Sequence, residues 1–392
     1  MMFLFCGFIL FEFFFYFIQK KSELILSKKD FIPLIKESLI NKFHSFDYEL
    51  GWVNQKNTVK IEVSQKKNIE YTYNHKGARS IGNLDMKKSP ISTYGDSFCQ
   101  GRESNDYETW QFFLSKQTNT NVTNFGVGNY GFDQSLLRLK REYENNKTNY
   151  VIIAITPYTI TRITSVWKHF SEFNNLLATK PRFLVKNNQL QLVPNFIKNK
   201  NELLNLNKHK QFLIDNDDHV EFLKRHIYGF PFIISFLKAP WPFFKILLNK
   251  VIKLAKIINL EVVINYLKLK YFNDEINYRK KLYDNNEKLL SLIIDEFVVF
   301  SKNNKFTPIL LVLPALEDVK YIQHTKDHYY HNYFNTGVND LIYWDFSENL
   351  INENKIEKYF TDEIWGGHYN SLGNKRLSKF IEKKINEHKI II

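Results

Sequence analysis

Apolar and polar positions along the chain follow two periods, and together they predict strands that alternate with helices. Continuous apolar runs are typical of parallel strands buried on both faces, and the clearest runs occupy residues 150–155 and 306–313. Further strands are expected at 90–94, 122–125 and 341–346, and helices at 108–116, 132–143 and 371–388. Strands in alternation with helices predict a parallel sheet that helices cover on both faces.

Two parts of the chain depart from this alternation. Residues from about 165 to 300 carry long amphipathic segments between two expected core strands, so we expect a mostly helical insertion there. Residues 22–89 are mixed, with an expected strand pair around 59–63 and 71–73. The expected division is therefore an apolar segment at 1–18, an N-terminal extension at 19–88 and a main domain at 89–392 that contains the insertion.

The first 18 residues are almost wholly apolar except for Glu12, and Lys20 and Lys21 follow them. At about 1.5 Å per residue, a helix of this length would just cross a hydrocarbon core of roughly 30 Å. Glu12 counts against a simple span, because a carboxylate near mid-membrane costs roughly 2–3 kcal/mol. A secretory signal and a buried hydrophobic helix are the alternatives. We expect membrane association through residues 1–18; the lysines favour a cytosolic body, and the side of the membrane stays open.

Composition narrows the classes of partner. The chain of 392 residues carries a net charge of +13, a balance that attracts nucleic acid, anionic lipid or acidic polysaccharide. Its basic residues are spread along the chain without a zinc-finger or RNA-binding motif, so we expect no nucleic-acid partner. Cys6 and Cys99 are the only cysteines, which excludes a disulfide framework and a Cys-x-x-Cys metal site from this pair.

The candidate chemistry begins at residues 94–101, Tyr-Gly-Asp-Ser-Phe-Cys-Gln-Gly. Gly95 allows a tight turn after the expected strand, and Ser97 then stands at the carboxyl edge of the sheet, where α/β proteins bind ligands. A serine hydroxyl needs a base and an oxyanion site before it acts as a nucleophile. Asp96 is expected to stabilise the turn and Cys99 to pack near it.

Three later segments supply candidates for those partners. Residues 124–131 contain three glycines within six positions, so their backbone turns sharply and presents N–H groups. Residues 156–162 follow the strand expected at 150–155 and lie at the same edge of the sheet. His368 lies in the glycine-rich segment 366–374, which opens the last expected helix, and a histidine in such a loop is able to point into a cleft.

Together these segments resemble the SGNH hydrolases, also called the GDSL esterase/lipase superfamily, from about residue 89 to the C-terminus with the insertion outside the shared core. The matching motifs are Gly95-Asp96-Ser97-Phe98, residues 124–131 with Asp133-Gln134, and His368 with Gly373-Asn374. The resemblance implies a flavodoxin-like three-layer α/β/α fold with a parallel sheet. It also implies that Ser97 is the nucleophile and His368 the general base.

A closer similarity is to a bacterial subgroup of this superfamily that is associated with modification of surface polysaccharides. The segments that carry it are Gly101-Arg102-Glu103, Glu108-Thr109-Trp110 and Lys180-Pro181-Arg182-Phe183. The resemblance implies that the substrate is an ester or an acylated carbohydrate.

The chain departs from the family pattern around the oxyanion. The family uses a backbone N–H there, usually from a glycine, and the matching position here is Asn129, beside Gly128. Asparagine tolerates left-handed backbone angles better than most residues. The third motif normally supplies an asparagine amide, and Thr159 matches that position with a shorter reach. Loss of one oxyanion donor typically lowers the rate about 10²–10³-fold.

A second departure concerns the acid that orients the histidine. The family commonly has an aspartate three residues before the histidine, where this chain has Trp365. Asp362 and Glu363 lie nearby, and Asp362 is the expected acid. The alternative is a backbone carbonyl that orients His368, as in Ser–His dyads.

The expected function is that of a serine ester hydrolase that removes acyl groups, such as acetyl, from a carbohydrate or a similar ester. An O-acyltransferase would use the same residues. A catalytically weakened, glycan-binding domain is the alternative from another class, and Thr159 and Trp365 are its support.

No cofactor and no metal are expected. His324, His328 and His331 are spaced by four and three positions, but they lie in a tyrosine-rich segment more typical of a loop than of a zinc-binding helix. The oligomeric state stays open.

Overall fold

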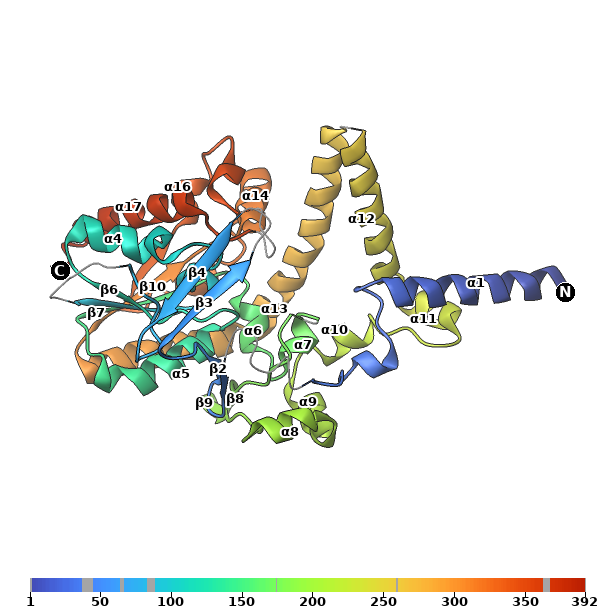
Figure 1. Cartoon of the computed structure of the whole chain (residues 1–392), viewed down its shortest axis with the longest axis horizontal. Helices are drawn as coiled ribbons and strands as arrows, with labels where there is room; N and C mark the ends of the chain where they lie inside the picture. The colour runs from blue at the N-terminus through green and yellow to red at the C-terminus, as the bar shows by residue number, and fades with distance from the viewer. Residues whose placement is uncertain are drawn as a thin grey trace. The chain divides into compact units, whose positions relative to one another are not determined.

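The computed structural model describes residues 2–36, 45–63, 67–82, 89–173, 175–258, 260–361 and 367–391 (Figure 1). The chain folds into two compact units. The first, called the helical unit below, contains Met1–Ile40, Thr164–Thr179 and Phe196–Glu275. The second, called the sheet unit, contains Asn41–Ile163, Lys180–Asn195 and Ile276–Ile392.

A parallel sheet of five strands forms the centre of the sheet unit, in the order β11-β10-β7-β5-β6. Its strands are β5 (Ile91–Gly95), β6 (Val122–Asn124), β7 (Tyr150–Ile155), β10 (Thr307–Val312) and β11 (Ile342–Asp345). Numbered along the chain, these strands lie in the order 2-1-3-4-5, which is the flavodoxin-like doubly wound arrangement. The direction of winding reverses between β5 and β7, and that point is where such sheets bind ligands.

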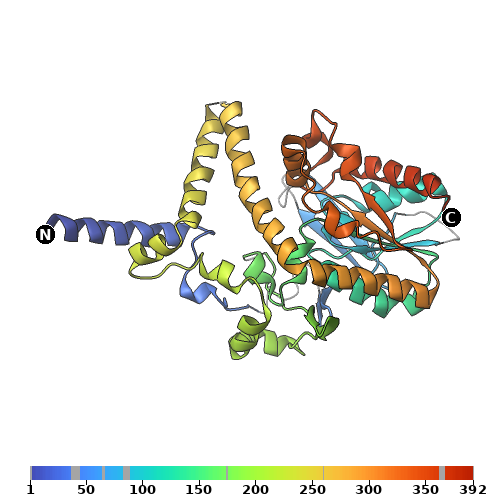
Figure 2. The same ribbon diagram turned by 180° about the vertical axis from the view of Figure 1, so that it is seen from behind.

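Helices cover both faces of this sheet because side chains alternate between the faces. Along β7, Val151 and Ile153 belong to one hydrophobic core, while Ile152 and Ala154 belong to the other. The core that contains Val151 and Ile153 packs against α5 (Phe132–Glu142) and against the second part of α13 (Glu261–Asn304), which begins at Ile276. The core that contains Ile152 and Ala154 packs against α4 (Trp110–Thr118) and α17 (Ser371–Glu387). Figures 1 and 2 show these two helix layers on opposite sides of the sheet, so the unit has three layers.

Shorter elements complete the sheet unit. The antiparallel pairs are β1–β2 (Ser45–Asp47, Gly51–Val53), β3–β4 (Thr58–Val63, Asn68–Tyr73) and β8–β9 (Arg182–Lys186, Gln189–Val193). The short helices are α3 (Ser97–Gln100), α6 (Thr159–Ile163), α14 (Leu316–Thr325), α15 (His331–Phe334) and α16 (Ser347–Leu350).

The five core strands lie where the hydrophobic pattern predicts them, but the boundaries of the units differ from the expected domains. Residues 1–40 belong to the helical unit, so the expected extension at 19–88 is divided between the units. The β8–β9 pair and the second part of α13, both expected in the insertion, belong to the sheet unit. The second part of α13 belongs to the sheet unit because Ile293, Ile294 and Phe297 fill the core on one face of the sheet.

The helical unit is built from α1, several short helices and a hairpin formed by α12 and the first part of α13. Its helices are α1 (Met2–Lys21), α7 (Lys168–Ser171), α8 (Lys200–Leu204), α9 (Lys210–Asn216), α10 (Val220–Lys224), α11 (Phe232–Lys238), α12 (Trp241–Ile257) and the first part of α13. Within the described part of the chain, no single helix has both the length and the hydropathy for a membrane span. The helices α11 and α12 have the required length and hydropathy only when they are taken together, and the pair bends by 87° at the break between them.

Candidate active site

Ser97 stands at the carboxyl end of β5, where the sheet reverses its winding. α3 begins at Ser97, with Asp96 as its N-cap. Gly95 has a φ of +157°, and a Cβ atom there would lie 1.8 Å from the carbonyl oxygen of Ala154 and 2.7 Å from Cβ of Cys99. Only glycine therefore lets the chain pass β7 and turn into α3 at this point. That turn brings Ser97 to the edge of the sheet at which ligands bind.

Gly95→Ala is expected to lower the free energy of unfolding by at least about 3 kcal/mol, because the added methyl group overlaps backbone atoms of β7. Urea denaturation followed by circular dichroism measures the change. Gly7→Ala is the matched control, since a Cβ atom at Gly7 meets nothing within 4 Å. An unchanged midpoint for Gly95→Ala would contradict this explanation of the turn.

Asp96 is fully buried and bonds to the residues around the turn. Its Oδ1 accepts the Phe98 N–H at 2.9 Å, and its Oδ2 accepts the N–H and the hydroxyl of Thr156 at 3.0 and 2.8 Å. Arg162 Nη1 donates to the same Oδ2 at 3.2 Å. Asp96 thus ties the end of β5 to the segment after β7, which is the stabilising role expected from the sequence.

The structure brings His368 to Ser97 from the far end of the chain. His368 Nε2 lies 2.9 Å from Ser97 Oγ, although 271 positions separate the two residues. The Thr361 N–H donates to the His368 carbonyl at 2.7 Å, which holds the backbone of the histidine loop. The Phe98 ring lies against the imidazole, with ring centroids 4.8 Å apart. The Ser97–His368 distance is within the range that general-base activation of a serine requires.

An acid that the sequence did not single out lies on the other side of the imidazole. Glu103 Oε2 is 3.3 Å from His368 Nδ1, and the Glu103 side chain is only 1% exposed. When His368 Nε2 accepts a hydrogen bond from the Ser97 hydroxyl, Nδ1 of the neutral ring carries the ring proton and donates a hydrogen bond to Glu103. Glu103 therefore occupies the place of the histidine-orienting acid. Asp362, the acid expected there, lies outside the described residues, as does Trp365.

The backbone of Glu103 is held in an unusual conformation. Its φ is +62°, in the left-handed region that costs an ordinary residue about 1–2 kcal/mol. The Glu103 N–H donates to the Tyr71 hydroxyl at 2.9 Å, and that hydroxyl donates to Glu62 Oε2 at 2.8 Å. Burial raises the pKa of Tyr71, so the hydroxyl keeps its proton. A strained backbone that its surroundings hold in place is typical of functional sites.

The loop after β6 passes close to the serine turn. A Cβ atom at Gly126 would lie 2.3 Å from the backbone nitrogen of Gln100, so this loop runs directly beside α3. Trp52 Nε1 donates to the Gly128 carbonyl at 2.9 Å and fixes the loop from the other side. Asn129 has a φ of +69°, the left-handed conformation that asparagine tolerates. The use of Asn129 and Gly128 at an oxyanion stays a prediction.

Thr159 has a structural partner in this region. It is fully buried, and its Oγ1 accepts the Phe132 N–H at 2.8 Å. That bond satisfies the first N–H of α5, which has no partner within its own helix. The bond explains a hydroxyl at this position, and a role for Thr159 as an oxyanion donor stays a prediction.

Glu108 and Lys180, which belong to the other two subgroup motifs, hold the surrounding segments in place. Glu108 Oε2 accepts the Asn105 N–H at 2.9 Å, shortly before α4. Lys180 Nζ lies 2.5 Å from Asp133 Oδ2, and neither side chain is exposed. Removal of one partner from such a buried pair leaves an uncompensated charge and is strongly destabilising. Glu108 and Lys180 therefore each have a structural partner within the sheet unit.

Other candidates for chemistry near the site are weaker. Burial raises the pKa of the Cys99 thiol, so it stays protonated and is a poor nucleophile. No group of three or more metal-ligating side chains occurs among the residues that the structure describes. Within that part of the chain, His324 lies near the end of α14 and His331 begins α15.

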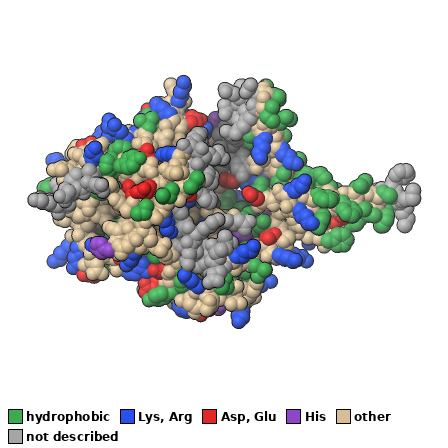
Figure 3. All heavy atoms as spheres, viewed as in Figure 1, with side chains coloured by type: hydrophobic (Ala, Val, Ile, Leu, Met, Phe, Trp, Pro, Cys, Tyr) green, Lys and Arg blue, Asp and Glu red, His purple; other side chains and the backbone are tan. Residues whose placement is uncertain are grey.

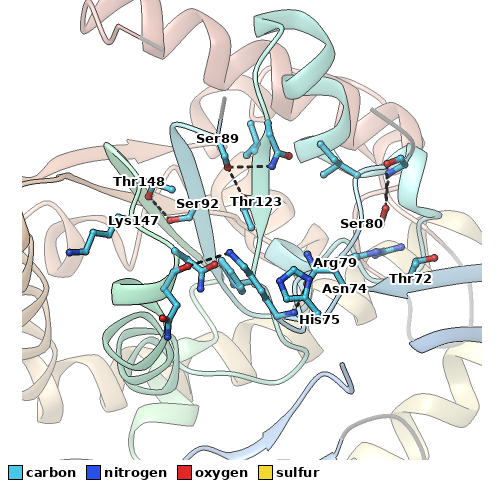
Figure 4. Close-up of a pocket in the computed structure, with 18 residues that line it drawn as sticks. Thr72, Asn74, His75, Arg79, Ser80, Ser89, Ser92, Thr123, Lys147 and Thr148 are labelled. Carbon is cyan, nitrogen blue, oxygen red and sulfur yellow. Dashed lines mark hydrogen bonds between the residues drawn. The ribbon is translucent and has the colours of Figure 1, made fainter. Parts of the chain in front are cut away.

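A separate cavity of about 550 Å³ lies at the opposite, amino edge of the sheet (Figure 4). Ser92 and Thr148 line it and are hydrogen-bonded to each other at 2.8 Å, as are Ser89 and Thr123. Since Ser97 stands at the carboxyl edge, this cavity is not part of the candidate active site.

No protein-family profile matches the chain, and no curated protein is significantly similar to it. Among solved structures, the chain is similar to one from Desulfitobacterium hafniense DCB-2 that is assigned to the G-D-S-L family of lipolytic proteins. The two chains are 13% identical with a TM-score of 0.33, and the match covers 75% of this chain and 98% of that one. The geometry of the site itself is therefore the basis for a function.

Proposed function

We propose that this protein is a serine ester hydrolase of the SGNH type. One observation carries the proposal: Ser97, His368 and Glu103 form a continuous row, with distances of 2.9 and 3.3 Å, beside the point where the sheet reverses its winding. A nucleophile, a base within hydrogen-bond reach and a third group that orients the base are the parts that acyl transfer from an ester needs.

The mechanism follows from these positions. Ser97 Oγ attacks the ester carbonyl carbon while its proton passes to His368 Nε2, and Glu103 accepts the Nδ1–H and stabilises the imidazolium. The N–H groups of Ser97 and Asn129, with the Thr159 hydroxyl, donate to the developing oxyanion. The C–O bond then breaks, the alcohol leaves with the proton from His368, and water releases the acyl group from Ser97 by the reverse sequence.

The proposed substrate is an acylated carbohydrate, with acetyl as the proposed acyl group. The support is the sequence similarity at 101–103, 108–110 and 180–183 to the subgroup associated with surface polysaccharides. An acyl-enzyme on Ser97 also reacts with a sugar hydroxyl in place of water, so O-acyl transfer is the second outcome that the same residues support.

A fluorophosphonate is expected to add one covalent group to the native protein, on the peptide that contains Ser97, because an activated serine oxygen displaces fluoride from phosphorus. Mass spectrometry of the digested protein locates the group. Protein unfolded in urea is the control and should stay unlabelled, since the His368–Ser97 contact is lost. Equal labelling of native and unfolded protein would count against an activated serine.

The substrate is tested with acetylated polysaccharide, in the presence and absence of a sugar acceptor. Release of acetate without an acceptor supports the hydrolase. Acetyl transfer that needs the acceptor supports the O-acyltransferase. Glycan binding without labelling of Ser97 would instead identify a catalytically weakened binding domain.

A further inference from the structure

Three helices of the helical unit present apolar side chains to solvent. The exposed apolar side chains are Phe5, Phe8, Ile9, Leu10, Phe13, Phe14, Tyr16 and Phe17 on α1, Ile234 and Leu237 on α11, and Trp241, Phe244, Leu247, Val251, Leu254 and Ile257 on α12. The exposed residues of α12 recur every three or four positions, so they form one stripe along that helix. Figure 3 shows the apolar side chains gathered along α1.

The exposed apolar area is larger than a soluble surface normally carries. With fractions that reach 71% for Leu10 and Leu237 and 77% for Ile257, these side chains together expose on the order of 1,000 Å². The largest apolar patch of a typical soluble monomer is roughly 300–600 Å². An apolar surface of this size indicates a partner.

Glu12, which argued from the sequence against a membrane position for α1, does not lie on this surface. It is 7% exposed, and its carboxylate accepts the N–H groups of Phe232 and Ile233 at 2.6 and 2.9 Å. The charge therefore satisfies the first turn of α11 inside the unit. Phe15 and Tyr228 pack in the same interior. The polar group of α1 thus points inward, and the outward side of the helix is apolar.

Lysines predominate among the charges that border the surface, although Glu23 is exposed two positions after Lys21. Residues 225–260 contain no aspartate or glutamate, and they carry lysines at 238, 245, 250, 253 and 256. Lys238, Lys250 and Lys253 are exposed, as are Lys20 and Lys21 at the end of α1. Lysines beside an apolar stripe with Trp and Phe are typical of helices that lie in the interface of an anionic bilayer. A protein partner would not require this excess of exposed lysines.

The bend between α11 and α12 also fits an interfacial position. Pro240 has no N–H, and the residue before a proline is disfavoured in the helical region, so α11 ends at Lys238. The two helices then diverge by 87°, which prevents a straight span but allows both to lie near the plane of a membrane surface.

We propose that α1, α11 and α12 form one docking surface that lies in the interface of a bilayer with anionic headgroups. The membrane association expected through residues 1–18 alone is thereby extended to three helices, of which α1 and α11 are joined at Glu12. This proposal is independent of the chemistry proposed for Ser97.

Vesicle flotation of the full chain tests the docking surface. The protein is expected to float with phosphatidylcholine vesicles that contain about 30% phosphatidylglycerol, at least about tenfold more than with pure phosphatidylcholine, and less at high salt. Leu237→Glu/Leu254→Glu is expected to lower flotation at least about tenfold. Val299→Glu is the matched control, because Val299 is 50% exposed on the sheet-unit part of α13 and should leave flotation unchanged.

Circular dichroism and thermal denaturation check that the variants are folded. Lys250→Glu/Lys253→Glu changes only exposed charges, and it should lower flotation with the anionic vesicles alone. Wild-type protein that stays unbound by anionic vesicles would overturn the proposal, as would a Leu237→Glu/Leu254→Glu variant that floats like the wild type. A dimer that this variant dissociates, without vesicle binding by either form, would assign the surface to a second copy instead.

Discussion

Ser97→Ala is expected to lower kcat for p-nitrophenyl acetate hydrolysis about 10⁴-fold. The reason is that alanine has no hydroxyl that His368 can deprotonate, so no acyl-enzyme forms. KM should change little, since Ser97 contributes its bond to the substrate only as the reaction proceeds. Steady-state rates of the purified variant, measured against the buffer background, give the ratio directly.

Ser89→Ala is the matched control for this loss. Ser89 is a serine of the same unit, but it lines the cavity at the amino edge of the sheet. Its replacement should leave kcat and KM unchanged. Comparable rates for Ser97→Ala and the wild type, with both proteins folded, would remove the hydrolase and the transferase together.

Glu103→Gln is expected to lower kcat about 10²–10⁴-fold with KM changed by less than about threefold. The carboxylate fixes which imidazole nitrogen carries the proton and stabilises the charge that forms on His368 as Ser97 attacks. An amide supplies a hydrogen bond but no charge. Steady-state kinetics separate kcat from KM, and the split distinguishes a positioning role from a general loss of structure.

Two further variants sharpen the test of Glu103. Glu103→Asp keeps the charge on a side chain one methylene shorter, so its kcat should fall between those of the wild type and Glu103→Gln. Glu108→Gln replaces a carboxylate of the same segment that accepts the Asn105 N–H, a bond that an amide oxygen also makes, and its kcat should be unchanged. Full activity of Glu103→Gln would return the orienting role to Asp362 or to a backbone carbonyl.

Ser97 and His368, two of the three residues of the candidate active site, could be predicted from local sequence, because the turn and the loop that carry them have local glycine signals. The apolar run at 150–155 is typical of a buried strand, and Gly95 before Ser97 signals the turn that exposes a serine. His368 is predictable because it stands in a glycine-rich segment just before a helix with a clear apolar period. The strand order, with its reversal beside β5, could not be read from any single segment.

The role of Glu103 could not be predicted from the residues near His368 in the sequence. The acid was expected near His368 in sequence, whereas the carboxylate beside His368 Nδ1 comes from a position 265 residues away. The available signal was a carboxylate shortly after the serine turn, in the segment Gly101-Arg102-Glu103. Only the approach of the histidine loop to that turn, and the bond from the Glu103 N–H to Tyr71, selects this acid.

The α/β class, the positions of the core strands, the serine turn and the histidine follow from local sequence, because hydrophobic period and glycine placement act through neighbouring residues. Three further features are visible only in the folded chain: the contact of His368 with Glu103, the division into two units and the burial of Glu12 against α11. Each of these depends on which distant segments meet, and hydrogen bonds between distant residues leave no periodic trace in the chain.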